Sequence, residues 1–309
     1  MNTAVIVCSS DFNERAFRSM DEKGLFDYVM AVDGGYAHLQ RIGRRADIVL
    51  GDFDSLGWEP KGIHAVKFPV EKDDSDFQLT MTRLLAYSYD RVYIFGALGR
   101  RLDHTLSNLR IGGSAARRGL QVVFVGMDET VFLLKGGKAW EADVLEEGAE
   151  AAGNNSSSPL CNDGKNADNN SSSPLCNDGE RHANNSSSPL SNDEEGDGNN
   201  SSSPLCSDEN SETDQAVLAE KIKITTENGE PALRVTRNGY EVAPGTTVSV
   251  MHLDGQVEGL FIRGLKWESD DAKVTEHPSL GLSNETTDEP ILICIDDGTI
   301  AIVVNSSIS

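Results

Sequence analysis

The sequence is poor in the features that several protein classes require. Its 309 residues contain five cysteines, with no CxxC pair and no Cys/His cluster at ligand spacing, so neither a zinc site nor a disulfide framework is expected. No run approaches the roughly 20 apolar residues of a membrane span. The amino terminus is too short and uncharged for a signal peptide. We therefore expect a soluble protein of the reducing cytoplasm.

Basic residues are also scarce, and one phosphate-binding loop is missing. Lys and Arg number 27 against 50 Asp and Glu, which gives a net charge of −23. Nucleic acids and anionic membrane surfaces repel such a chain, so neither is an expected partner. The pattern Gly-x-x-x-x-Gly-Lys-Ser/Thr is absent, and P-loop phosphate binding is excluded with it.

Residues 1–127 alternate short apolar runs with amphipathic segments. The runs predicted as strands are 5–8, 28–32, 48–50, 63–68, 92–95 and 121–125. The segments predicted as helices are 14–20, 36–42, 75–89 and 104–118. In the last of these, Leu106, Leu109 and Ala115 are expected to face inward. This alternation predicts an N-terminal α/β domain with a mainly parallel sheet and helices on both faces.

Residues 128–309 have a different pattern. Gly, Asn, Asp and Pro turns separate strand-like runs at 130–134, 222–226, 232–236, 247–253, 257–261, 291–295 and 300–304. Long helical periodicity is missing. We therefore predict a C-terminal all-β sandwich domain of roughly 100 residues.

A low-complexity insertion, residues 149–215, interrupts this second domain after its first predicted strand. The motif Asn-Asn-Ser-Ser-Ser-Pro-Leu begins at Asn154, Asn169, Asn184 and Asn199. Each repeat offers too few apolar side chains to offset an ordering cost of about 1–2 kcal/mol per residue. We predict a disordered insertion. It is either a tolerated loop expansion or a tract for partner docking or modification.

Acidic or glycine-rich clusters follow four of the predicted N-terminal strands. They are Asp33-Gly34-Gly35, Gly51-Asp52-Phe53-Asp54-Ser55, Lys72-Asp73-Asp74-Ser75-Asp76 and the stretch from Gly96 to Asn108. Ligands of open parallel sheets bind outside the carboxyl ends of the strands, so the four clusters should converge on one crevice. Carboxylates, arginines and glycines together suit a divalent metal and a polyphosphate.

Two of the clusters supply carboxylates. Asp52 and Asp54 are two apart, and in extended backbone both would point at one hard cation; otherwise they are a pair of solvated turn residues. Ser75 is predicted to cap the following helix, which places Asp73 and Asp76 at its positive end. Alternatively, these acids only interact favourably with the positive end of the helix dipole.

The last cluster combines flexible backbone with cations. Gly96 and Gly99 allow a ligand to approach the chain closely. Arg100 and Arg101 lie beside these glycines, and an arginine there can bind phosphate oxygens bidentately. Asp103 could instead cap the next helix, and His104 could be a packed histidine. Asn108 completes the cluster.

Taken together, these motifs resemble the thiamine pyrophosphokinase (thiamine diphosphokinase) family. The matching pieces are Val32-Asp33-Gly34-Gly35, Gly51-Asp52-Phe53-Asp54-Ser55, Lys72-Asp73-x-Ser75-Asp76-Phe77, Gly96-x-x-Gly99-x-Arg101-x-Asp103-His104-x-x-x-Asn108, Gly264-Leu265-Lys266-Trp267 and Leu282-Ser283-Asn284-Glu285. The resemblance implies a catalytic α/β domain and a thiamine-binding β-sandwich. It also implies a homodimer with active sites between subunits. The implied reaction moves a diphosphate from ATP to the thiamine hydroxyethyl oxygen, with Mg²⁺, and releases AMP.

The resemblance also assigns roles to residues. Metal-site carboxylates would be Asp52, Asp54, Asp73 and Asp76. The ATP site would comprise Asp33, Gly34, Gly35, Gly96, Gly99, Arg100, Arg101, His104 and Asn108. Trp267, Ser283 and Asn284 would belong to the thiamine pocket. Arg101 would contact the phosphate. The attacking hydroxyl must lose a proton, and Asp76 and Asp103 are both candidates for the carboxylate that accepts it.

Trp267 also has two interpretations of its own. Its indole can stack on the flat thiamine cation. Alternatively it is an ordinary residue of the sandwich core.

The chain departs from the family pattern in two places. Arg100 stands where the family often has a second glycine, and the long insertion is foreign to the pattern.

Three functions other than thiamine diphosphorylation stay open. A related diphosphokinase acting on a pterin alcohol would keep the N-terminal clusters but lack the Trp267 and Ser283-Asn284 elements. A hydrolase would use Asp52 as phospho-acceptor. A nucleotide or thiamine sensor would bind its ligand without catalysis.

Overall fold

The computed structural model describes residues 1–54, 56–69, 71, 73–145, 233–236, 239–272, 280–306 and 308. All of these belong to one compact unit, Met1–Glu150 with Lys221–Ser309. The predicted insertion 149–215 and the predicted strand 222–226 lie outside the described residues.

The N-terminal part is an α/β layer, as predicted. Its elements are β1 (Thr3–Val7), α1 (Glu14–Glu22), β2 (Tyr28–Val32), α2 (Gly35–Arg41), β3 (Ile48–Gly51), β4 (Ala65–Lys67), α3 (Asp76–Leu84), β5 (Arg91–Phe95), α4 (Leu102–Arg117) and β6 (Gln121–Val125). The strands pair in parallel in the order β6-β5-β1-β2-β3-β4. Their carboxyl ends therefore share one edge of the sheet.

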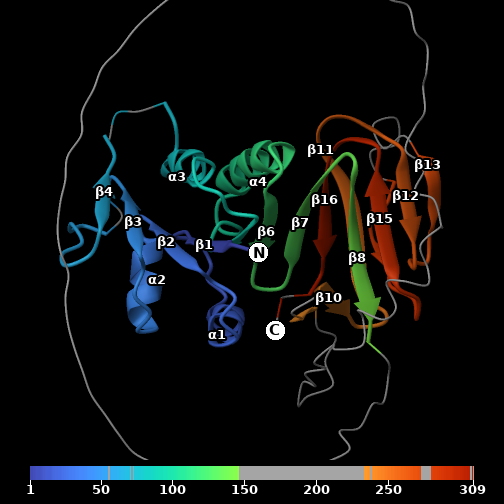
Figure 1. The fold of residues 1–309 in the computed structure, drawn as a ribbon, viewed down its shortest axis with the longest axis horizontal. Coiled ribbons are helices and arrows are strands. Elements are labelled where there is room, and N and C mark those ends of the chain that lie inside the picture. Colours follow the sequence, from blue (N-terminus) through green and yellow to red (C-terminus); the bar gives the residue numbers. More distant parts are fainter. Residues whose placement is uncertain are drawn as a thin grey trace, which may run out of the picture. The chain divides into compact units, whose positions relative to one another are not determined.

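Helices cover both faces of this sheet because its strands are apolar on both sides. Val5 and Val7 of β1 pack in one core cluster with α1 and α2. Ala4 and Ile6 of the same strand pack with α3 and α4 in the other. Figure 1 shows the two pairs of helices on opposite sides of the sheet.

The same sheet continues across residue 127 with antiparallel strands. It adds β7 (Thr130–Lys135), β16 (Asp297–Val304), β11 (Thr247–Glu258) and β14 (Asn284–Glu285), in that order beyond β6. A second, six-stranded sheet has the order β13 (Ser269–Ala272), β12 (Leu260–Arg263), β15 (Ile291–Ile295), β8 (Lys138–Val144), β10 (Gly239–Val242) and β9 (Arg234–Thr236). Side chains of both sheets share one core cluster, which makes the predicted sandwich.

Three details of the sequence prediction are wrong. Both β7 and β8 precede the insertion, whereas only one strand was expected there. The predicted strand 257–261 is divided at Gly259, whose φ of +67° ends β11 and lets β12 begin. Leu106 is 55% exposed, because the inward face of α4 is made by smaller residues. A Cβ at Gly112 would lie 2.7 Å from the ring of Phe124, so the helix contacts the sheet through glycine.

No helix among the described residues combines the length and the apolar character needed to cross a membrane.

Candidate active site

A pocket of about 350 Å³ opens at the carboxyl edge of the parallel strands. It is lined by Cys8, Ser9, Ser10, Val32, Asp33, Ser75, Asp76, Phe77, Gly96, Ala97, Gly99, Arg100, Arg101, His104 and Asn108. These residues lie at or after the carboxyl ends of β1, β2 and β5, at the start of α3, or in the first half of α4. The structure thus brings three of the four sequence clusters to one pocket, and the fourth reaches it through Asp52.

Three carboxylates gather at this pocket. One oxygen from each of Asp33, Asp52 and Asp76 lies within 4.8 Å of the other two. Asp33 directly follows β2 and has φ +45°, and its Oδ1 accepts a hydrogen bond from the backbone N–H of Phe53 at 3.2 Å. A Cβ at Gly51 would sit 1.7 Å from that oxygen, so only glycine lets the second cluster approach Asp33 this closely.

The electrostatics of this group favour a bound cation. Partial burial, then the neighbouring Asp76 carboxylate, raises the pKa of Asp33 from 3.8 to about 7; Asp52 adds to the rise. Three negative charges this close repel one another unless a proton or a cation lies among them. Carboxylate oxygens are the ligands that Mg²⁺ prefers, so the group fits a divalent metal.

Asp54 and Asp73 lie apart from this group of three. Both are exposed. The expectation that Asp52 and Asp54 point the same way rested on extended backbone between them, and that premise is wrong. Phe53 is buried with φ +65°, and the N–H of Asp54 donates to Oδ1 of Asp52 at 3.2 Å. A metal-ligand role for Asp54 or Asp73 stays a prediction.

The amino ends of two helices meet the pocket. Ser75 caps α3 as predicted, its hydroxyl accepting from the N–H of Gln78 at 3.2 Å. Arg101 stands at the N-cap position of α4 without a side-chain cap, and Asp103 lies in the first turn rather than at the cap. Helix amino ends carry unpaired N–H groups and partial positive charge, which suits an anion.

The loop between β5 and α4 is shaped by its glycines. Gly96 and Gly99 have φ of +65° and +85°. A Cβ on Gly96 would come within 2.3 Å of the carbonyl oxygen of Cys8. The side-chain amide of Asn108 donates to the carbonyl of Ala97 at 2.8 Å. Asn108 therefore holds this loop in place besides lining the pocket.

The two arginines of this loop are paired with different acids. Nε of Arg100 donates to Oδ1 of Asp11 at 2.8 Å, which ties the loop to the segment after β1. Arg101 makes two hydrogen bonds to Asp103. The Arg101 hydrogen bond lowers the pKa of the exposed Asp103 to about 2.

Sequence reasoning missed Ser9, Ser10 and Asp11. They could have been found in the same way as the other clusters, because they are polar residues directly after a predicted strand. Conversely, Gly34 and Gly35 do not line the pocket. A Cβ on Gly35 would lie 1.9 Å from the carbonyl oxygen of Val7, so this glycine allows α2 to contact β1.

A second pocket, of about 420 Å³, lies in the β-sandwich. Its lining is Ile262, Trp267, Glu268, Ser269, Leu280, Gly281, Leu282 and Asn284. Trp267 is 56% exposed, so the interpretation that it belongs to the sandwich core is wrong. Lys266 places its ammonium 5.2 Å from the centre of the indole ring.

Asn284 is buried and fixes the backbone at Trp267. Its Oδ1 accepts from the N–H of Trp267 at 3.0 Å and from that of Glu285 at 2.9 Å, and its Nδ2 donates to the Trp267 carbonyl at 2.7 Å. Ser283 is exposed, with φ +53°, and its N–H donates to the hydroxyl of Ser249 at 3.0 Å. This pocket shares no lining residue with the pocket at the carboxylates.

Comparison with known families matches two models of one family to two separate stretches of the chain. The thiamin pyrophosphokinase catalytic-domain model matches residues 24–124, and the thiamin pyrophosphokinase vitamin B1 binding-domain model matches residues 232–300. Together they cover more than half of the chain. A search of curated proteins found no match.

Solved structures of similar fold include thiamine pyrophosphokinases from three organisms. The Bacillus subtilis protein has a TM-score of 0.57 at 13% identity, with 99% of each chain covered. The Candida albicans protein has a TM-score of 0.56 at 14% identity, covering 99% of this chain and 89% of that one. The Geobacillus thermodenitrificans protein has 0.55 at 14% identity, covering 99% and 98%. At these identities the likeness concerns the fold.

Proposed function

Since the chain belongs to the thiamin pyrophosphokinase family of enzymes, we propose that it transfers a diphosphate from ATP to the hydroxyethyl oxygen of thiamine, giving thiamine diphosphate and AMP. The observation that carries this proposal is the group of Asp33, Asp52 and Asp76 beside a pocket made from two helix amino ends and two arginines. Phosphoryl-type transfer depends mainly on positioning and charge neutralisation, and those are what this arrangement offers.

Different residues at the pocket would bind the phosphates of ATP and the metal ion. Residues at the amino ends of α3 and α4, with Arg100 and Arg101, line the pocket, and there they would bind a polyphosphate. Asp33, Asp52 and Asp76 would hold Mg²⁺, with Asp54 and Asp73 as the further ligands expected from sequence. When bound, the metal would neutralise phosphate charge and orient the transferred group.

Of the two candidates for the general base, Asp76 is better placed. It lines the pocket and begins α3. Asp103 does not line the pocket, and its pKa of about 2 makes it a weak proton acceptor. We propose that Asp76 accepts the proton of the attacking hydroxyl.

The pocket at Trp267 supports thiamine over a pterin alcohol as the acceptor. An exposed indole beside a pocket can stack on the flat, cationic thiamine ring. Because the ATP pocket and this pocket share no residue, we propose that the enzyme is a homodimer in which each active site combines the two pockets from different subunits. Cys8 and Cys294 are both buried, and we propose the reducing cytoplasm as the location of the protein.

Product analysis tests the reaction. The full chain is incubated with ATP, Mg²⁺ and thiamine, and AMP and thiamine diphosphate are measured. Equal amounts of both products are expected. AMP without thiamine diphosphate would identify a hydrolase, and no product together with measurable ligand binding would identify a sensor.

A pair of variants tests the carboxylate group. Asp52→Asn should reduce turnover at least a hundredfold, a rise of about 2.7 kcal/mol in the barrier. The matched control is Asp74→Asn, an exposed acid outside the group, which should keep the wild-type turnover. Equal turnover in the two variants at saturating Mg²⁺ would refute the metal assignment.

A further inference from the structure

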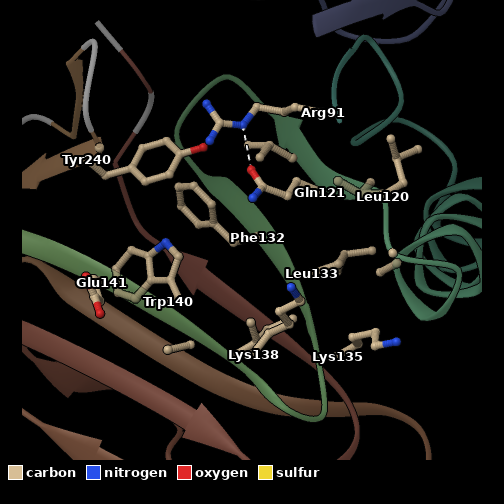
Figure 2. Close-up of a pocket in the computed structure, with 17 residues that line it drawn as sticks. Arg91, Leu120, Gln121, Phe132, Leu133, Lys135, Lys138, Trp140, Glu141 and Tyr240 are labelled. Carbon is tan, nitrogen blue, oxygen red and sulfur yellow. Dashed lines mark hydrogen bonds between the residues drawn. The ribbon is translucent and has the colours of Figure 1, made fainter. Parts of the chain in front are cut away.

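Another pocket, of about 400 Å³, lies at the opposite ends of the parallel strands. Figure 2 shows it between the beginnings of β5 and β6 and the strands β7, β8 and β10. Arg91 and Gln121 are the first residues of their strands, whereas the candidate active site follows the strand ends. A five-residue strand is roughly 16 Å long, so the two sites are separated along the sheet. No residue of this pocket lines either of the other two.

Three aromatic rings form one wall of this pocket. The ring of Phe132 lies 5.2 Å from that of Trp140 and 4.5 Å from that of Tyr240, centre to centre. Figure 2 shows the three rings side by side, contributed by three different strands. Such a wall offers stacking and edge contacts to another flat ring.

Within this wall, the indole nitrogen of Trp140 has no hydrogen-bond partner among the described residues. Trp140 is only 6% exposed, so this donor is removed from water at a cost of about 1–3 kcal/mol. Figure 2 shows the nitrogen on the ring edge toward Phe132, away from Glu141. An acceptor atom of a ligand in the pocket would satisfy it.

The pocket is also positive, in a chain whose net charge is −23. The guanidinium of Arg91 donates to Oε1 of Gln121 at 2.9 Å and to the hydroxyl of Tyr93 at 3.3 Å. Neither Arg91 nor Lys138 forms an ion pair with a carboxylate of the described residues. Lys135 donates to a backbone carbonyl, that of Arg117, at 3.3 Å.

Glu141 is the single acid among the lining residues. It follows Trp140 in β8, so its side chain lies on the other face of the strand. Figure 2 shows its carboxylate beyond the indole, on the side away from Arg91. The cations of the pocket are therefore left for an external anion.

We propose that this pocket is a binding site for a small aromatic anion, a compound of one or two rings that bears a carboxylate. The ring lies against Phe132, Trp140 and Tyr240, and the carboxylate accepts hydrogen bonds from Arg91 and from the Trp140 indole N–H. Ligand pockets for small molecules begin at roughly 300 Å³, so the volume suits such a compound.

The test uses three matched probes on the full chain. Indole-3-carboxylate has the ring and the charge, indole-3-carboxamide lacks the charge, and cyclohexanecarboxylate lacks the aromatic ring. Calorimetric titration should give a Kd for the first at least about tenfold below those of the other two. Saturating ATP, Mg²⁺ and thiamine should leave that Kd unchanged. No heat with indole-3-carboxylate up to about 10 mM, equal binding of the acid and the amide, or loss of binding on adding ATP or thiamine would overturn the proposal.

Variants locate the binding. Arg91→Gln should weaken the acid about tenfold or more, and Trp140→Phe, which keeps an aromatic ring in the wall but removes the N–H together with part of the indole surface, about threefold or more. Lys138→Gln changes an exposed side chain, keeps the fold, and should weaken the acid about threefold. Lys67→Gln, an exposed lysine on β4, is the matched control and should change nothing. Wild-type affinity in both Trp140→Phe and Lys138→Gln would refute this site even if Arg91→Gln fails to fold.

Discussion

Replacing Asn284 by alanine should both destabilise the protein and disorganise the pocket at Trp267, where we propose that thiamine binds. The side chain is 2% exposed and makes three hydrogen bonds to backbone groups, two of them to Trp267. At about 0.5–1.5 kcal/mol for each bond, their loss lowers the free energy of unfolding by about 3 kcal/mol. Thiamine affinity should fall as well, because Trp267 loses the support of its backbone.

Urea unfolding and calorimetric titration with thiamine provide the measurements. Asn284→Asp keeps both acceptor bonds but buries a carboxylate with one oxygen against the Trp267 carbonyl, so at neutral pH it should be at least as unstable as Asn284→Ala. If Asn284→Ala unfolds at the wild-type urea concentration while binding thiamine weakly, Asn284 contacts the ligand directly and the positioning role is refuted.

The remaining predictions concern three other regions. Trp267→Ala should weaken thiamine binding by about 0.5–2 kcal/mol and leave ATP–Mg²⁺ binding and the melting temperature nearly unchanged, since the ring is 56% exposed; a large melting shift with parallel loss of both ligands would contradict this. The pKa of Asp33 is raised from 3.8 to about 7 in the folded state. Without metal, in EDTA, the free energy of unfolding should therefore fall as the pH rises between these two values, by about 1–2 kcal/mol after solvent screening. Asp33→Asn should therefore melt higher than wild type at pH 8, equally at pH 4, and show a smaller rise with Mg²⁺; identical melts at every pH would count against the charge cluster. Replacing residues 149–215 with a short Gly/Ser linker should preserve folding and activity, because the segment's composition supplies few core residues; aggregation of the shortened chain would show that the segment is structural.

Sequence alone was sufficient for the architecture and for the convergence of most site residues. The N-terminal alternation of apolar and amphipathic segments predicts parallel strands, whose polar carboxyl ends must share one edge. This is why Asp33, Asp76 and the glycine-rich loop could be expected at one pocket. Ser75 was likewise predictable as a cap, because capping depends on residues within one turn.

The local sequence pattern did not predict side-chain positions where a backbone dihedral or the burial of a residue departs from the usual value. We expected Asp52 and Asp54 to point the same way because side chains alternate along extended backbone. The positive φ at Phe53 breaks that alternation, and residue spacing alone does not predict a positive φ. Asp33 joins the carboxylates because glycine at position 51 lets two loops touch. Leu106 faces solvent because the contact of α4 with the sheet uses glycine and alanine.

The sequence by itself thus determined the fold class and the set of residues from which the site is drawn, because periodicity and turn chemistry are local properties. Only the tertiary structure decided which of those residues line a pocket, which support a neighbour and which lie elsewhere. It made Asn284 a support for Trp267, left the indole of Trp267 exposed, and brought Arg91 and Trp140 to one pocket from strands about 50 residues apart in sequence. Such groupings depend on contacts between distant segments, which no local pattern encodes.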